Sequence, residues 1–397
     1  MNTRIDKKYS AISIPAAVLG VGSWLFLGVL RLACADTLPQ QLGLHSGRDI
    51  YQAACAACHG ANGEGTPETT AGFVRPETFP HFNKCDETTP ESTRDWKAVV
   101  RDGGPGRGFS QIMPSFGEVL TSQQIDKVVA YLRGLCTEKP WPRGELNVPR
   151  ALITEKAFPE SETVLTSSVN AKGAPGISNE LAYEKILGKR DQLEVAIPFS
   201  WIHKDTGGLY GGVGDIALGL KHVMFSELNS SDTQPLFKST GSILSLQAET
   251  VLGTGNAQRG LGTGETSFGV FAAYDKLLPA MAFVQIQTGV DLPLHPSDEV
   301  PRSAYMRTAF GKSFSGDMQL GRLWTPMIEL VADRDLISGA TTHWDIVPEF
   351  QVTLSRRQHI RTALGYRLPL NDTAGRPRQI MMYFLWDWFD GGLWEGW

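Results

Sequence analysis

The sequence predicts a multi-domain protein, with a small all-α domain followed by an antiparallel transmembrane β-barrel of about twelve strands. Three observations lead to this prediction. Apolar residues at helical spacing mark residues 44–137, whereas alternation of apolar and polar residues recurs through residues 161–397. The connections between the alternating segments are short and long in turn, which is typical of barrels that cross an outer membrane.

Composition excludes several classes of protein. The chain has 397 residues, of which 42% are hydrophobic and 20% charged, so it is too apolar to be disordered. The net charge is −5 and no basic run extends beyond Lys7-Lys8, which argues against a nucleic-acid partner. Five cysteines are too few for a disulfide scaffold. No stretch after residue 35 reaches the roughly 18 unbroken apolar residues of a membrane helix.

Residues 1–35 are predicted to be a signal peptide. A positively charged start is followed by an apolar stretch at residues 11–30, and Ala33-Cys34-Ala35 has the small-residue pattern of a cleavage site. An uncleaved anchor helix is the alternative, because the apolar stretch is long for a signal. Cys34 does not suit a lipid anchor, since Arg31 stands where a lipoprotein signal has an aliphatic residue. Export would place the other cysteines in an oxidising compartment.

Cys55-Ala56-Ala57-Cys58-His59 is the C-x-x-C-H attachment motif of c-type haem. Two cysteines at this spacing on a helix can reach both vinyl groups of one porphyrin, and the adjacent His59 can then bind the iron. A C-x-x-C pair alone could also serve redox or zinc chemistry, but no second pair follows. Ser46 precedes the motif as a helix N-cap. We expect one covalently attached haem c.

The second iron ligand is predicted to be Met113. It follows a glycine-rich stretch at residues 103–108, where glycines allow the backbone to approach a porphyrin. Pro114 stiffens the turn that presents the sulfur. The alternative for Met113 is core packing, which is the commoner role of a loop methionine. His81 is the competing ligand, and we interpret it as a surface or propionate-side histidine.

A last helix of the α-domain is predicted from Thr121, with Gln124 completing a capping box. This helix should pack across the helix that precedes the haem motif. Its apolar stripe consists of Ile125, Val128, Val129 and Leu132.

Residues 44–137 as a whole resemble class I cytochrome c, on the basis of Cys55, Cys58, His59, Met113-Pro114 and the two terminal helices. The resemblance implies an all-α fold and one-electron transfer at an iron with His59 and Met113 as ligands. Cys85 and Cys136 are an addition to the usual pattern. Two non-haem cysteines in an oxidising compartment predict a disulfide, and the alternative is two buried thiols.

Residues 138–160 are predicted to be a proline-rich linker, semi-rigid and extended, that separates the α-domain from the strands. It contains Pro140, Pro142, Pro149 and Pro159.

Residues 161–397 are predicted to form the barrel. Leu193 to Trp201 alternates with Glu194 to Ser200, and Leu246 is expected to face lipid while Gln247 faces the lumen. A soluble β-domain is the alternative, although it has no reason to alternate its loop lengths. The exception to the alternation is the long connection 227–239. The predicted strands lie near 161–169, 178–187, 191–203, 213–226, 240–253, 264–275, 279–290, 302–314, 317–331, 342–356, 357–369 and 377–389. The expected lumen residues are Glu194, Lys221, Glu249, Gln285, Arg307, Glu349 and Arg361.

Gly214–Lys221 and Leu193–Phe199 resemble small outer-membrane barrels of the aromatic-degradation transporter type, and the whole chain resembles fused monohaem cytochrome–porins. Our first hypothesis is an electron carrier at the outer membrane. Twelve strands is an even number and the tight turns follow even-numbered strands, which predicts that the haem domain faces the periplasm. Its partners would be periplasmic cytochromes or an extracellular electron donor or acceptor. The alternatives are a small-solute channel with an accessory cytochrome and a soluble periplasmic carrier. No nucleophile–base pair stands out, so we do not expect an enzyme.

Overall fold

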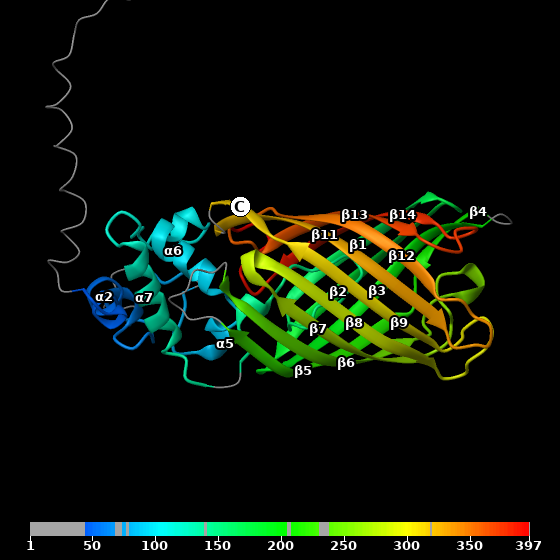
Figure 1. The fold of residues 1–397 in the computed structure, drawn as a ribbon, viewed down its shortest axis with the longest axis horizontal. Coiled ribbons are helices and arrows are strands. Elements are labelled where there is room, and N and C mark those ends of the chain that lie inside the picture. The colour runs from blue at the N-terminus through cyan, green and yellow to red at the C-terminus, as the bar shows by residue number, and fades with distance from the viewer. Residues whose placement is uncertain are drawn as a thin grey trace, which may run out of the picture. The chain divides into compact units, whose positions relative to one another are not determined.

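The computed structural model describes residues 44–67, 74–76, 79–138, 141–204, 208–229, 238–317 and 320–396. The predicted signal peptide at residues 1–35 lies outside this part of the chain. Among the described residues, no helix has both the length and the apolar character needed to cross a membrane. Helices come first along the chain and strands follow (Figure 1).

The N-terminal domain is all-α, as predicted. The capping box expected at Thr121 with Gln124 is present. Ser46, expected as an N-cap, also forms a capping box, with Asp49. Its described helices are α2 (Gly47–Ala54), α3 (Ala56–His59), α5 (Cys85–Thr88), α6 (Thr93–Gly106) and α7 (Ser122–Arg133).

Helices α2 and α7 cross at close range, as the sequence predicts. A Cβ atom on Gly47 would lie 2.0 Å from the carbonyl oxygen of Lys127, so a glycine is needed at the crossing. The rings of Tyr51 and Tyr131 lie 5.3 Å apart beside it. The surrounding core consists of Ile50, Tyr51, Phe82, Val100, Leu120, Ile125, Val128, Val129 and Leu132.

The expected disulfide is also present. Cys85 at the start of α5 is bonded to Cys136 after α7, with 5.2 Å between their Cα atoms. The bridge ties the segment between the haem motif and α6 to the end of the domain.

Residues 162–387 form a closed antiparallel barrel of twelve strands. The first strand pairs with the last, from Glu162 opposite Asp387 to Lys172 opposite Arg378, which closes the ring. The strands are β1 (Glu162–Lys172), β2 (Gly176–Leu187), β3 (Asp191–Lys204), β4 (Gly208–Val213), β5 (Ile216–Asn229), β6 (Thr240–Leu252), β7 (Ser267–Leu277), β8 (Ala282–Pro293), β9 (Ser303–Lys312), β10 (Phe314–Asp317), β11 (Leu320–Asp335), β12 (His343–Thr353), β13 (Ile360–Pro369) and β14 (Arg378–Asp387).

Two of the twelve strands are interrupted. Strands β4 and β5 both pair with β3, and β9 and β10 both pair with β11, so each couple occupies one position in the ring. Every predicted strand segment overlaps one of the twelve positions. The prediction of a transmembrane-type barrel is therefore confirmed, and the soluble β-domain is not.

The two faces of the barrel differ as predicted. Leu246 is 42% exposed and points outward, whereas the adjacent Gln247 is 2% exposed and points inward. None of the seven expected lumen residues is exposed. An exposed apolar face around a closed ring is the surface that a lipid bilayer covers. It includes Leu165, Leu181, Leu220, Phe268, Val270, Phe310, Trp324, Ile328, Phe350, Leu364 and Ile380.

Connection lengths differ between the two ends of the barrel. The end at which β1 begins carries the short connections 188–190, 278–281, 318–319 and 354–359, together with the longer 230–239 that the sequence already singled out. The opposite end carries the longer loops 253–266, 294–302, 336–342 and 370–377, with the three-residue turn 173–175 between β1 and β2 as an exception.

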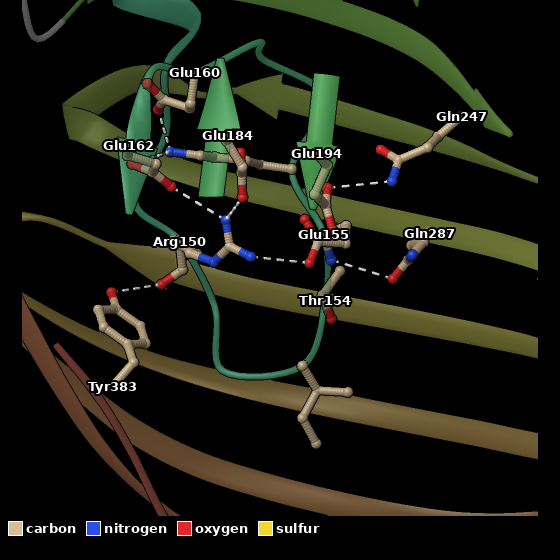
Figure 2. A network of polar contacts seen from close by, with 12 residues as sticks. Arg150, Thr154, Glu155, Glu160, Glu162, Glu184, Glu194, Gln247, Gln287 and Tyr383 are labelled. Carbon is tan, nitrogen blue, oxygen red and sulfur yellow. Dashed lines mark hydrogen bonds and ion pairs between the residues drawn. The ribbon is translucent and has the colours of Figure 1, made fainter. Parts of the chain in front are cut away.

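The predicted linker differs from expectation. We expected residues 138–160 to form an extended spacer, but residues 146–160 run inside the barrel (Figure 2). Leu146 packs with Val223 and Ile243, and Leu152 packs with Val347. We call residues 146–160 the plug. The proline content predicts an irregular backbone, and the backbone of this segment is irregular. Proline content gives no information on what surrounds the backbone.

Candidate functional site

The haem motif lies at the junction of two short helices. Cys55 ends α2 and begins α3, and its carbonyl oxygen accepts hydrogen bonds from the backbone N–H groups of Cys58 (3.1 Å) and His59 (2.9 Å). Gly60 then leaves the helix with φ of +79°, a conformation that favours glycine. The motif is thus held as one helical turn, with both cysteines half-buried and free.

His59 lies in an aromatic pocket. Its ring lies 4.8 Å from the ring of Phe79, stacked, and 4.8 Å from the ring of Phe82. Burial lowers the pKa of His59 to about 4, so the imidazole is neutral at physiological pH. Its buried Nδ1 has no hydrogen-bond partner among the residues that the structure describes. A neutral, orientated imidazole is the form of histidine that binds a metal.

The cysteines have the chemistry that haem attachment requires. Burial, and then the neighbouring Cys58, raise the pKa of the Cys55 thiol to about 11. Two free thiols and a neutral imidazole thus lie within one helical turn. This donor set fits a covalently bound haem c.

Met113 lies on a loop that packs tightly against the end of α6. Its carbonyl oxygen accepts a hydrogen bond from the N–H of Gly104 at 3.0 Å. Gly103 has φ of +74°, and a Cβ atom there would lie 2.9 Å from the carbonyl carbon of Pro114. The glycines allow close backbone packing within the loop itself, and Met113 is half-buried. Their predicted role in approach to a porphyrin stays a prediction.

His81, the competing ligand, is engaged elsewhere. Its Nδ1 lies 2.9 Å from Oε2 of Glu87, and its backbone N–H donates to the same oxygen at 3.0 Å. Glu87 also pairs with Lys84. These contacts agree with His81 as a surface histidine.

The barrel interior holds a network of buried charges centred on the plug (Figure 2). Arg150 Nη1 lies 2.6 Å from Glu184 Oε1 and 3.1 Å from Glu162 Oε1, and its Nη2 lies 3.0 Å from Glu155 Oε1. Lys156 pairs with Glu160 and, at 3.8 Å, with Glu162. Charges removed from water are tolerated when they are paired, so each plug cation needs its carboxylate partners, Glu155 and Glu160 in the plug and Glu162 and Glu184 on the barrel.

The plug backbone is hydrogen-bonded by side chains of the barrel wall. Glu329 accepts from the N–H groups of Ile153 and Thr154, and Asp275 accepts from that of Ala157 at 2.7 Å. An irregular segment inside a barrel has no ladder partner, so these side chains satisfy the backbone groups that would otherwise be orphaned. Further partners are Glu349 for Leu152, Gln287 for Glu155, Gln192 for Glu160 and Tyr383 for the carbonyl of Arg150.

Sequence reasoning missed Arg150 and Lys156 because they lie in a segment interpreted as a linker. A signal was available, since apolar residues such as Leu146, Leu152 and Phe158 are interleaved with the charges. A solvated spacer has no need of such residues.

Residues 43–132 match the family described as cytochrome c oxidase, cbb3-type, subunit III. Cytochrome c-555 of Prosthecochloris aestuarii is 33% identical over 97 residues, which are 23% of this chain and 88% of that protein.

Solved structures similar to this chain include outer-membrane channels. One from Pseudomonas putida F1 aligns with 58% of this chain and 97% of its own length, with 16% identity and a TM-score of 0.38. A NanC porin aligns with 57% of this chain and 98% of its own length, with 7% identity and a TM-score of 0.38.

Proposed function

The chain belongs to the cytochrome c family through its N-terminal domain, and on that premise we propose that it carries single electrons. The electrons would pass between periplasmic redox proteins and the outer membrane or the cell exterior. The chain is a fusion of a cytochrome c domain with a closed barrel of the outer-membrane type. The electron-carrying role is the function that best accounts for both parts.

We propose a single haem c, attached through Cys55 and Cys58 and ligated by His59 and Met113. The single C-x-x-C-H motif, the free thiols and the neutral imidazole support this assignment. When bound, the haem supplies Fe(II)/Fe(III) chemistry. The chain would provide the ligands, a surrounding of low dielectric and a docking surface. These are the means by which a protein tunes the reactivity of such a cofactor.

The observation that carries the proposal is the occupied barrel interior. Lys156, Ala157 and Phe158 of the plug are at most 2% exposed, and their neighbours on the wall hold the plug by hydrogen bonds and ion pairs. A segment held in this way is a fixed part of the barrel. We therefore assign the barrel the role of anchoring the cytochrome domain.

A small-solute channel is the second candidate. Opening the part of the lumen that the plug fills would require the plug to leave the barrel. The cost of separating Arg150 from the buried barrel carboxylates Glu162 and Glu184 argues against this. A soluble periplasmic carrier is the third candidate. The apolar outer face of the barrel argues against it, because a soluble protein would expose that face to water.

The cytochrome domain is proposed to face the periplasm. It precedes β1, and the short connections lie at the end where β1 begins. Short turns are periplasmic in outer-membrane barrels. We also propose that the chain is not an enzyme, since electron transfer requires ligands and docking but no substrate chemistry.

Attachment of the haem can be tested on a denaturing gel. Thioether bonds survive denaturation, so the wild-type band should stain for haem and the Cys55→Ser/Cys58→Ser variant should not. An equal stain in both proteins would contradict covalent attachment at this motif.

The choice between carrier and channel can be tested in proteoliposomes. Reduced protein mixed with an oxidised small c-type cytochrome should exchange electrons, which stopped-flow absorbance would detect. Liposomes containing the protein should not swell in an isotonic sugar solution. Rapid swelling without electron exchange would favour the channel.

A further inference from the structure

The connection 354–359 between β12 and β13 contacts the loop that carries Met113. Arg357 Nε donates a hydrogen bond to the carbonyl oxygen of Gly108 at 2.9 Å. Its guanidinium also lies over the ring of Phe109, 4.5 Å from the centroid. One barrel residue therefore makes two directed contacts with the loop, five and four residues before Met113 in the sequence.

Arg357 is held in place from behind by the C-terminal segment. Its side chain is 7% exposed, and Nη1 lies 3.0 Å from Glu395 Oε2. A Cβ atom on Gly396 would lie 2.6 Å from Cγ of Arg357, so the chain end packs directly along the arginine. A side chain that is buried and paired on its other side has little freedom to move away from the loop.

The same connection contacts the start of α6. Gln358 adopts φ of +67°, which is unusual for a residue other than glycine, and its Oε1 accepts from Arg94 Nη2 at 3.2 Å. Backbone conformations of this kind persist when surrounding contacts hold them, and they gather at functional sites. The connection 354–359 thus contacts the chain at two points, at Arg94 near the start of α6 and at Gly108 in the loop that leads to Met113.

Contacts within the loop link Gly108 to Met113. The N–H of Phe109 donates to the carbonyl of Gly104 at 2.7 Å, and the N–H of Gly104 donates to the carbonyl of Met113 at 3.0 Å. A Cβ atom on Gly104 would lie 2.0 Å from the carbonyl oxygen of Ser110, so the two sides of the loop are in tight contact. A displacement at Gly108 must therefore move the backbone that bears Met113.

We propose that Arg357 is a positioning residue for the distal side of the haem, so that the barrel holds the methionine ligand on the iron. This inference rests on the proposed role of Met113. It makes distal ligation a property of the whole chain rather than of the cytochrome domain alone. Loosening the contact should raise the fraction of time that the distal position is open.

The test compares Arg357→Ala, Arg357→Lys and Phe109→Leu in the full-length, haem-loaded protein. Arg334→Ala is the matched control, because Arg334 is exposed at the opposite end of the barrel, where it donates to Thr342. The readouts are the affinity of the ferric protein for added imidazole, the red absorption band of methionine-ligated ferric haem and the midpoint potential. Heat-modifiable gel mobility shows that each barrel is closed.

Arg357→Ala should bind imidazole at least about tenfold more tightly than the wild type, with a weaker red band and a lower potential, because a hydrogen bond and a cation–π contact are lost. Arg357→Lys and Phe109→Leu leave part of the contact, so their imidazole affinities, red bands and potentials should lie between those of the wild type and Arg357→Ala. Arg334→Ala should match the wild type.

Wild-type behaviour of both Arg357→Ala and Phe109→Leu would overturn the positioning role. Met113→Ala separates this failure from that of the proposed function. If Met113→Ala changes imidazole affinity and potential while the other variants do not, the ligand assignment stands and Arg357 has no role in it. If Met113→Ala changes neither, the ligand assignment itself is wrong.

Discussion

Arg150 of the plug and Glu184 of β2 form an ion pair inside the barrel, with 2.6 Å between Nη1 and Oε1. Their side chains are 9% and 1% exposed, so neither charge is well hydrated. Arg150 also contacts Glu155 and Glu162. One guanidinium therefore compensates three carboxylates, and the pairing is concentrated in a single residue.

Replacing Arg150 by alanine should destabilise the barrel strongly. Removal of one partner leaves buried carboxylates without compensation, which costs about 3–5 kcal/mol. Lys189→Ala is the matched control, since that cation is 45% exposed and pairs with Glu138 at the surface, where a salt bridge contributes about 0–1 kcal/mol. The temperature at which the folded band is lost on a semi-native gel measures both effects. Equal losses would contradict a structural plug.

Arginine should be tolerated on one face of β6 and not on the other. Leu246→Arg places a charge in lipid and should cost about 2–4 kcal/mol near the middle of the membrane. Gln247→Arg faces inward, where Glu194 already accepts a hydrogen bond from Gln247 at 3.2 Å and can pair with the new cation. Yield of folded protein in the membrane fraction compares the two variants. A barrel that faced water would show no such difference.

Met113→Ala should remove the weak red absorption band of the oxidised protein and lower its potential, since methionine ligation raises the potential. His81→Ala is the control and should leave the spectrum unchanged, because His81 is paired with Glu87. Optical titration with redox mediators gives both quantities. Loss of the band in His81→Ala, and not in Met113→Ala, would show that the assignment of Met113 as the ligand is wrong.

Replacing Cys85 and Cys136 by serine should destabilise the cytochrome domain. The bridge spans 51 residues in sequence. The chain-entropy account of such a loop gives about 4 kcal/mol, less any strain in the folded state. Thermal loss of the haem-domain absorbance should therefore occur at a lower temperature in the double variant. Unchanged melting, or recovery of both thiols from the periplasm-matured protein, would contradict the bridge.

The sequence predicted those features whose causes are local. The caps at Ser46 and Thr121 and the alternation at Leu246 and Gln247 follow from spacing alone, and the structure contains all of them. The disulfide followed from the count of cysteines and the compartment. The closed barrel was predicted from the alternation of short and long connections between the strands.

The plug and the contact of Arg357 could not be predicted in the same way. Lys156 lies in a segment without periodicity, and its burial depends on the ring that later strands build around it. Arg357 and Gly108 lie 249 residues apart, and their contact depends on where the barrel end meets the domain. Spacing within a short window carries no information on such distant pairs.

The position of the plug in the chain has a consequence for biogenesis. Residues 146–160 directly precede β1, and β1 forms the seam of the ring with β14, the last strand to be synthesised. The ring can therefore be completed around a segment that is already in place, and no passage of this segment through a finished wall is required. Tyr383 of β14 donates a hydrogen bond to the carbonyl oxygen of Arg150 at 3.0 Å, so the final strand contacts the plug directly beside that seam.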